Sequence, residues 1–304
     1  MTASADGPAA EGITFPGAAE PARESWFDSD GLRIHVVEWG REGDPPLVLC
    51  HGFWDHVRGF ATLAPLLAAG GYRVCALDVR GHGDSDWAHT YFWWSWIADI
   101  VRLVESIDRE VALIGHSFGG GQAVDTAVVI PHRVRKVVNI DGFGPPPDDE
   151  TTPTLTAQFE QFLDYRRKIT ERPTWRPYAD LQQLIARRGA QNPRLDGPWL
   201  EYFAFHGARR SAAGWTWKAD PQMAVGMGPW KPEFVEHSYA ALRRPLLAVE
   251  GTEKDTWGPL PDTVIAPRLD RARNVERVRI AGAGHFVHME RPHETAAAIL
   301  SFLG

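Results

Sequence analysis

A serine between glycines is the strongest chemical signal in the chain. The stretch Gly115-His116-Ser117-Phe118-Gly119-Gly120 directly follows the apolar run 111–114 and directly precedes a helical segment. A G-x-S-x-G pattern between a strand and a helix places the serine hydroxyl on a tight turn, where the free N–H groups of the helix favour negative charge. We therefore expect Ser117 to be a nucleophile. The alternative is an ordinary strand-to-helix turn with a capping serine.

A serine nucleophile needs a base, and histidine is the usual choice. His285, in Ala283-Gly284-His285-Phe286, follows the run 276–280, so we expect it at the same edge of the sheet as Ser117. His288 and His293 are alternatives. For His288 we favour a structural role, as a hydrogen-bonded histidine at the start of a helix.

The base in turn needs an orienting carboxylate. Asp255 follows the strand-like run 246–249 and is our first candidate, while Glu253, two positions earlier, points elsewhere. Asp141, at the end of the run 134–140, remains the second candidate because that strand end faces the same site. The other interpretation of Asp141 is a loop or helix cap.

The elements that must position these residues alternate along the chain. Continuous apolar runs, typical of strands buried on both faces, occupy 47–50, 74–77, 111–114 and 134–140, and further strand-like segments follow at 246–250 and 276–280. Helix-length segments lie between or after them at 57–69, 92–107, 120–130, 261–269 and 293–302. Residues 26–39 read as a hairpin. This order predicts an α/β fold with a mostly parallel central sheet flanked by helices.

Three regions follow from the composition. Residues 1–23, rich in Ala, Gly and Pro, are expected to form a flexible N-terminal arm. Residues 24–144 and 245–304 carry the alternating strands and helices of the core. Residues 145–244 contain no strand-like run and are rich in proline and tryptophan, so we expect a mostly helical cap inserted into the core.

The chain order Ser117, Asp255, His285 resembles that of the α/β-hydrolase family. His51-Gly52-Phe53-Trp54 resembles the H-G loop after the family's third strand, and the stretch 78–85 (DVRGHGDS) resembles the turn after its fourth. The stretches 139–144 (NIDGFG) and 190–195 (AQNPRL) are similar to a serine-hydrolase-like subgroup. The resemblance implies an α/β-hydrolase fold with a helical cap, and an oxyanion hole made by the backbone N–H groups of Phe53 and Phe118.

Aromatic residues close to these loops are the candidates for the substrate pocket. Trp54, Phe143 and Trp257 each lie within two residues of a loop expected at the site. A pocket lined by them would favour an apolar acyl or alcohol group.

Composition and motifs also exclude several functions. A net charge of -7 disfavours nucleic acid and anionic membrane surfaces as partners. The first 23 residues lack the features of an export signal, no run approaches a membrane span, and two cysteines are too few for a disulfide framework, so we predict a soluble, cytoplasmic protein. The stretch 51–56 resembles an H-x-H-x-D-H metal motif, but Phe53 replaces the middle histidine. We predict no metal and no cofactor.

These observations predict a serine hydrolase that cleaves an ester-type bond of a small, largely apolar substrate through an acyl-serine intermediate. A lactone, a thioester or an activated carbon–carbon bond would use the same triad. The alternatives from other classes are a non-hydrolytic lyase or haloperoxidase-like enzyme and a slow-turnover ligand-binding protein. Dehalogenation and epoxide opening in this fold use an aspartate nucleophile, and Ser117 makes them unexpected.

Overall fold

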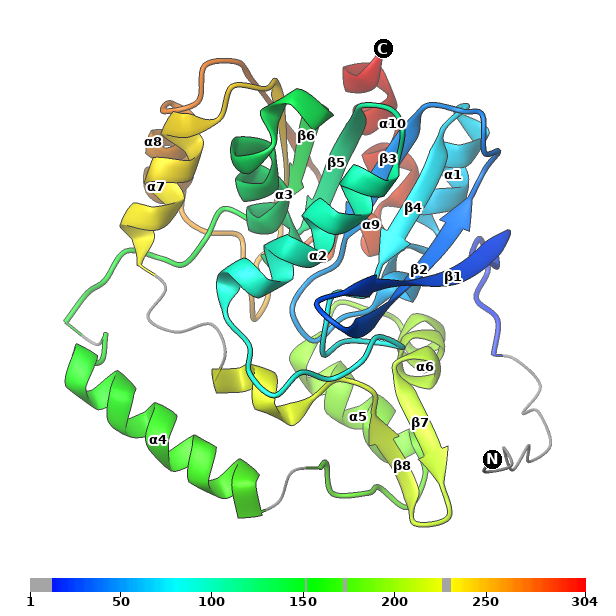
Figure 1. The fold of residues 1–304 in the computed structure, drawn as a ribbon, viewed down its shortest axis with the longest axis vertical. Helices are drawn as coiled ribbons and strands as arrows, with labels where there is room; N and C mark the ends of the chain where they lie inside the picture. Colours follow the sequence, from blue (N-terminus) through cyan, green and yellow to red (C-terminus); the bar gives the residue numbers. More distant parts are fainter. Residues whose placement is uncertain (1–12, 151, 172–173, 226–230) are drawn as a thin grey trace.

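The computed structural model describes residues 13–150, 152–171, 174–225 and 231–304. Eight strands form one sheet in the order β1-β2-β4-β3-β5-β6-β9-β10 (Figure 1). Their bounds are β1 Arg23–Ser29, β2 Leu32–Trp39, β3 Pro46–Cys50, β4 Arg73–Leu77, β5 Val111–His116, β6 Val134–Ile140, β9 Leu246–Gly251 and β10 Val275–Ile280. The β1–β2 hairpin and the β2–β4 pair are antiparallel, and the remaining neighbours are parallel. The predicted fold class is confirmed.

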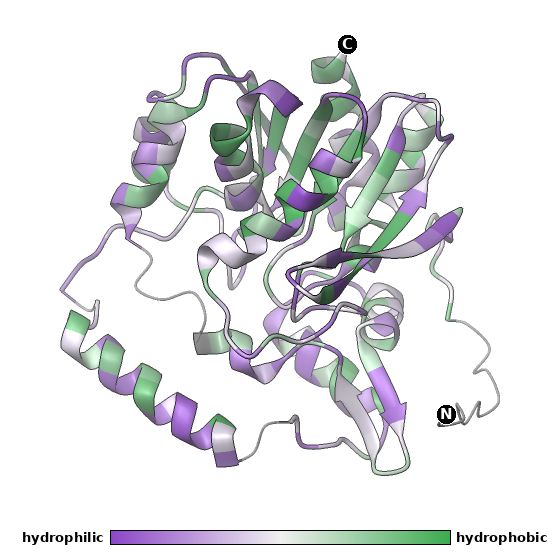
Figure 2. Ribbon diagram, in the orientation of Figure 1, coloured by the Kyte–Doolittle hydropathy of each residue, from purple (hydrophilic) through white to green (hydrophobic). Residues whose placement is uncertain are grey.

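Helices cover both faces of the sheet. The helices α2 Trp93–Ser106, α3 Phe118–Val129, α7 Pro232–Ala241 and α8 Asp262–Leu269 pack on one face, and α1 Leu63–Ala69, α9 Val287–Glu290 and α10 Pro292–Leu303 on the other. Neighbouring residues of one strand enter opposite layers, as Val48 and Leu49 do. This explains why the central strands are apolar without alternation, which Figure 2 shows as green ribbons in the middle of the molecule.

A group of elements between β6 and β9 lies below the carboxyl ends of the central strands in Figure 1. We call it the insert. It comprises α4 Leu155–Glu171, α5 Leu181–Gln191, α6 Gly197–His206, β7 Ala208–Ser211, β8 Gly214–Trp217 and the 3-10 turn η3 Pro221–Val225. Trp199 and Phe203 of α6 are buried against Ala61 and Met289 of the core. The two-stranded β7–β8 sheet was not expected from the sequence.

Two sets of contacts lie at the expected domain boundaries. The described part of the N-terminal arm packs on the rest of the chain, because Phe15 stacks on Trp199 with 5.0 Å between ring centroids and Trp39 Nε1 donates to the Ala19 carbonyl over 2.9 Å. Helix α7 falls inside the predicted cap range, yet it lies in the helical layer of the core. There the Tyr239 hydroxyl accepts a 2.9 Å hydrogen bond from Asn139 Nδ2 of β6.

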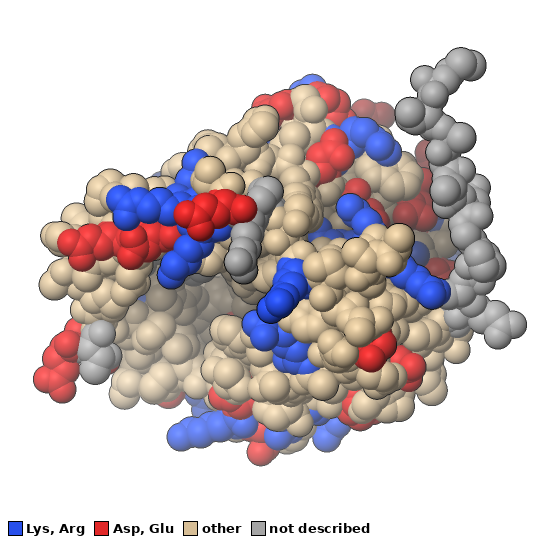
Figure 3. All heavy atoms as spheres, turned by 90° about the horizontal axis from the view of Figure 1, so that it is seen from below, with Lys and Arg blue, Asp and Glu red and all other residues tan. Residues whose placement is uncertain are grey.

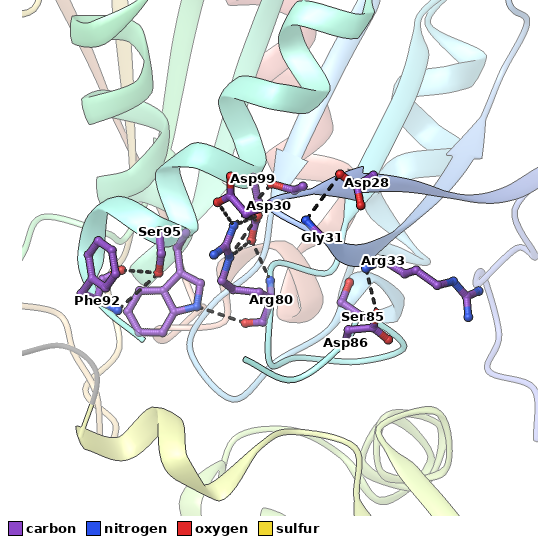
Figure 4. Close-up of polar contacts among 12 residues, drawn as sticks. Asp28, Asp30, Gly31, Arg33, Arg80, Ser85, Asp86, Phe92, Ser95 and Asp99 are labelled. Carbon is purple, nitrogen blue, oxygen red and sulfur yellow. Dashed lines mark hydrogen bonds and ion pairs between the residues drawn. The ribbon is translucent and has the colours of Figure 1, made fainter. Parts of the chain in front are cut away.

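The turn after β4 is held by a buried arginine. Arg80 binds Asp99 of α2 through Nε and Nη2, with Nη2 2.6 Å from Asp99 Oδ1, and Nη2 also reaches Asp30 of the β1–β2 turn at 2.9 Å (Figure 4). The Trp96 indole donates to the Arg80 carbonyl over 3.1 Å. A multiply bonded guanidinium of this kind fixes orientation as well as charge. It joins the β1–β2 hairpin, the turn after β4 and α2.

The surface on the side of the insert carries acidic and basic side chains interspersed, with a hollow between its elements (Figure 3). Within the described residues, we find no helix whose length and hydropathy would let it cross a bilayer. Both cysteines, Cys50 and Cys75, are buried free thiols in the central strands.

Candidate active site

Ser117 occupies a strained turn between β5 and α3. Its backbone has φ 53° and ψ −119°, a left-handed value that a residue with a side chain rarely adopts. The flanking glycines make this turn fit. A Cβ at Gly115 would lie 2.0 Å from the Gly119 carbonyl oxygen, and one at Gly119 would lie 2.2 Å from the Cys50 carbonyl oxygen. The spacing of the glycines therefore follows from close backbone packing around the serine.

Phe53 and Phe118, which line one cavity together with Ser117, have backbone N–H groups without an acceptor among the described residues. Phe118 is the first residue of α3, so its N–H has no acceptor within the helix. Phe53 lies in the loop after β3, against which Gly119 packs. Among the described residues, neither N–H has a hydrogen-bond acceptor. Both are available to bind a negatively charged oxygen.

His285, in the loop after β10, is paired with Asp141. Its Nδ1 lies 2.6 Å from Asp141 Oδ2, and both side chains are buried. The carboxylate can accept from Nδ1–H, and in that tautomer Nε2 is the basic nitrogen. Asp141 itself follows β6 and has φ 48°. The Asn139 side chain holds this turn from both sides, by donating to the Gly142 carbonyl and accepting from the Gly142 N–H, each over 2.9 Å.

Asp255 does not contact the imidazole as we expected. Its Oδ2 accepts from the backbone N–H of His285 over 2.7 Å, and its Oδ1 accepts from the N–H groups of Trp257 at 2.8 Å and Gly258 at 3.1 Å. The physical reason is position. Asp141 comes immediately after β6, the direct neighbour of β5, whereas Asp255 lies four residues beyond β9 in a loop that turns its carboxylate onto the backbone. The second sequence candidate thus takes the ring, and Asp255 fixes the loop that carries it.

A buried ion pair lies next to the site. Arg188 of α5 binds Asp55, and its Nη1 donates to the Trp54 carbonyl over 3.3 Å. Burial would raise the pKa of Asp55, but the charge of Arg188 and the nearby His116 ring hold it well below its usual range. His116 Nδ1 lies 3.6 Å from Asp55, and its Nε2 donates to the His285 carbonyl over 3.0 Å, so these contacts connect the insert to the loop that carries His285. Sequence reasoning missed Arg188 and Asp55, which are 133 residues apart.

Two cavities meet at the proposed catalytic residues. The larger, about 440 Å³, is lined by Phe53, Trp54, Asn192 and Phe286 among others, and the smaller, about 200 Å³, by Phe143 and Leu260. Both are lined by a shared set: Ser117, Phe118, Trp257 and His285. All three aromatic pocket candidates therefore line a cavity at the site.

The other candidate residues lie elsewhere. His293 is exposed at the start of α10. His288 is buried against His116 with 4.4 Å between ring centroids, and burial lowers its pKa well below the usual value. Its Nδ1 has no partner among the described residues, so the expected hydrogen bond at this atom is absent. Glu253 Oε1 accepts from the Thr252 hydroxyl over 3.0 Å rather than from a histidine.

The side chains of the metal-like stretch 51–56 are engaged separately. His51 Nδ1 donates to the Gly52 carbonyl over 2.7 Å, Asp55 binds Arg188, and His56 Nε2 donates to the Phe203 carbonyl over 3.0 Å. A different group, His35, Asp78 and Asp84, has its oxygen and nitrogen atoms within 4.8 Å of one another. Burial opposes a charge on His35, but the hydrogen bonds and charges of its acidic neighbours, Asp78 foremost, together outweigh burial and raise the pKa of the ring. This favours an ion pair over a metal ligand.

Comparison with known proteins assigns the fold family. The model of the alpha/beta hydrolase family matches residues 47–298, and the chain belongs to that family. It is a hydrolase. The match spans β3 to α10, so it contains the carboxyl ends of β3, β5, β6, β9 and β10, after which the candidate site residues lie.

Individual relatives agree with this assignment. The chain is 27% identical over 282 residues to a probable serine hydrolase of Drosophila melanogaster, covering 89% of this chain and 84% of the relative. It is 29% identical over 288 residues to a 3-hydroxybutyrate-oligomer hydrolase of Cupriavidus necator, covering 90% of this chain and 93% of the relative. Among solved structures, the thioesterase domain from the curacin biosynthetic pathway superposes with a TM-score of 0.78 at 23% identity, over 91% of this chain and 98% of that domain. The last likeness concerns the fold.

Proposed function

We propose that the protein hydrolyses a carboxylic ester of a small, largely apolar molecule through an acyl-serine intermediate. The observation that supports this most is the convergence of Ser117, on a strained turn, with His285, paired to Asp141, on the same two cavities. An ordinary capping serine would need neither the strain nor the buried histidine–carboxylate pair.

The side chains divide the reaction between them. Ser117 Oγ attacks the ester carbonyl while its proton passes to His285 Nε2, and Asp141 stabilises the imidazolium that forms. The N–H groups of Phe53 and Phe118 bind the oxyanion, which in related chemistry lowers the barrier by several kcal/mol. The carbon–oxygen bond to the alcohol then breaks, and the alcohol leaves with the proton from His285. Water then attacks the acyl-serine while His285 takes its proton. The bond to Ser117 Oγ breaks, His285 returns the proton to the serine, and the acid is released.

The relatives support hydrolysis at an acyl group. The Cupriavidus necator relative is named for hydrolysing 3-hydroxybutyrate oligomers, and the Drosophila relative is named as a probable serine hydrolase. The aromatic walls formed by Phe53, Trp54 and Trp257 favour an apolar body in the substrate.

A short aryl ester tests the proposal. Rapid mixing with 4-nitrophenyl butyrate should give a burst of nitrophenol equal to the enzyme concentration, provided that deacylation is slower than acylation. Ser117→Ala should remove the burst and lower kcat/KM by at least about 1,000-fold. A fluorophosphonate should label Ser117 in the native enzyme alone. Equal rates for the two proteins would disprove the assignment of the nucleophile.

A further inference from the structure

Among the described residues, the side chain of Asn192 has no hydrogen-bond partner, although it is almost completely buried. It ends helix α5 of the insert and is 3% exposed, and both its amide nitrogen and its amide oxygen lack a hydrogen-bond partner among the described residues. Its backbone is fully engaged, since the N–H donates to the Arg188 carbonyl over 2.9 Å and the carbonyl accepts from the Leu195 N–H over 3.1 Å. The helix end therefore does not need the amide. Buried polar groups without partners are rare and call for a specific explanation.

Asn192 lines the larger cavity together with Ser117 and His285. Both sides of its segment are fixed to the core. Trp257 Nε1 donates to the Gln191 carbonyl over 2.9 Å, and Arg194 donates to Glu290 at 2.9 Å and to the Gly282 carbonyl at 3.0 Å. Because these bonds hold the segment, the amide cannot easily turn out to bulk water. Asn192 is therefore held in the wall of the cavity, with its amide still without a partner among the described residues.

The charges near Asn192 favour a neutral oxygen group. The Arg188 guanidinium, which also lines the cavity, is neutralised by Asp55, and its Nε is buried without a partner among the described residues. Asp141, on the smaller cavity, adds a negative charge next to His285. Among the described residues that line this cavity, Arg188 is the one Lys or Arg side chain, so a substrate carboxylate would meet no uncompensated cation there. An amide, in contrast, donates to a carbonyl and both donates to and accepts from a hydroxyl.

We propose that Asn192 determines specificity by binding a second oxygen function of the substrate, a hydroxyl or carbonyl outside the scissile ester group. The preferred substrates are then hydroxy- or oxo-substituted esters whose remaining surface is apolar. This inference rests on the proposed ester hydrolysis and adds the substrate class. It also gives a role to the AQNPRL stretch at 190–195, which the catalytic residues left unexplained.

Matched pairs of esters test it. For the native enzyme we compare kcat/KM for 4-nitrophenyl butyrate with the 3-hydroxybutyrate ester, and the pentanoate with the 4-oxopentanoate ester. A third pair, butyl and 3-hydroxybutyl acetate, places the oxygen on the alcohol. At least one oxygenated ester should be preferred, and Asn192→Leu should reduce that preference ratio by roughly 10- to 100-fold, as is usual when a buried hydrogen-bonding group loses its partner. The 4-nitrophenyl hemisuccinate, whose second oxygen function is a carboxylate, should show no preference over 4-nitrophenyl butyrate.

Two further variants make the result decisive. Asn192→Ser keeps a small donor and acceptor, so it should retain part of the preference. This separates loss of the hydrogen bond from distortion of the cavity by leucine. Gln182→Leu removes an exposed amide from the same helix and should leave all ratios unchanged. If the native enzyme and Asn192→Leu show the same ratios for every pair, the amide binds only water and the inference is wrong, while ester hydrolysis still stands. If no ester gives a Ser117-dependent burst, the proposed function itself fails.

Discussion

The two aspartates next to His285 can be separated by replacing each with asparagine. Asp141 contacts the imidazole Nδ1 at 2.6 Å, so Asp141→Asn removes the negative charge that stabilises the imidazolium. It also removes the acceptor that fixes the ring tautomer. Loss of this carboxylate in serine triads costs about 10,000-fold in kcat, which corresponds to about 5.4 kcal/mol of transition-state stabilisation. We expect a loss of this size for Asp141→Asn.

Asp255→Asn should have a different signature. Its carboxylate accepts three backbone N–H groups, from His285, Trp257 and Gly258. An asparagine offers one oxygen in place of two, so at least one of these three N–H groups loses its charge-assisted hydrogen bond. The expected cost is about 1.5–3 kcal/mol in folding stability. The catalytic loop loosens, but the ring keeps its partner. We expect a lower Tm and a loss of kcat/KM of about 10- to 100-fold.

The assay is steady-state hydrolysis of 4-nitrophenyl butyrate, with thermal unfolding followed by circular dichroism on the same samples. Fluorophosphonate labelling of Ser117 shows how far the serine stays activated in each variant. If Asp255→Asn lost about 10,000-fold and Asp141→Asn less than 100-fold, Asp255 would be the triad acid, and the ring would have to move towards it in solution. Our reasoning from the resting geometry would then be refuted.

Two further predictions concern the turn that carries Ser117 and the buried His82. Gly119→Ala places a Cβ 2.2 Å from the Cys50 carbonyl oxygen, so the free energy of unfolding should fall by about 1–3 kcal/mol and fluorophosphonate labelling of Ser117 should decrease. Gly197→Ala is the control, because nothing lies within 4 Å of its added Cβ. It should change neither quantity in the same melting and labelling experiments. Burial lowers the pKa of His82 to about 3, so between pH 6.5 and 3 the unfolded chain binds a proton that the folded chain does not. Each pH unit of acidification in this window therefore costs about 1.4 kcal/mol at this site, and His82→Gln should flatten the dependence of the unfolding free energy on pH by that slope in urea titrations. At pH 8–9 the two slopes should coincide, and an unchanged slope at pH 4–6 would contradict the neutral buried ring.

Local patterns predicted the turn that carries Ser117 and the sheet, but not which aspartate contacts His285. Glycines at 115 and 119 are needed because backbone atoms lie against them, so their spacing is visible in the sequence. The choice between Asp141 and Asp255 depends on the order of the strands and on a φ of 48° at Asp141, and neither can be read from composition. A signal was present in Asn139-x-x-Gly142, whose side-chain bonds hold the turn that carries Asp141.

Long-range pairs were beyond sequence reasoning for a related reason. Arg188 and Asp55 bind across 133 residues, and nothing in either local stretch names the other. Helix α7 was placed in the cap because its neighbours are rich in proline and tryptophan, yet Tyr239 is bound to Asn139 of β6. Composition identifies the inserted region, but packing decides which of its helices belongs to the core layer.

Backbone strain is concentrated where the chemistry is proposed. In the part of the chain that the structure describes, four non-glycine residues have positive φ, and three of them, Trp54, Ser117 and Asp141, line the two cavities. The fourth, Asp30, lies in the β1–β2 turn. Such conformations cost about 1–3 kcal/mol each and persist only where the surroundings enforce them. At Ser117 the close backbone packing of Gly115 and Gly119 enforces it, and at Asp141 the Asn139 side chain does. The strain is thus maintained by Gly115, Gly119 and Asn139, which do not line the two cavities, and this holds the hydroxyl and the carboxylate in place before a ligand arrives.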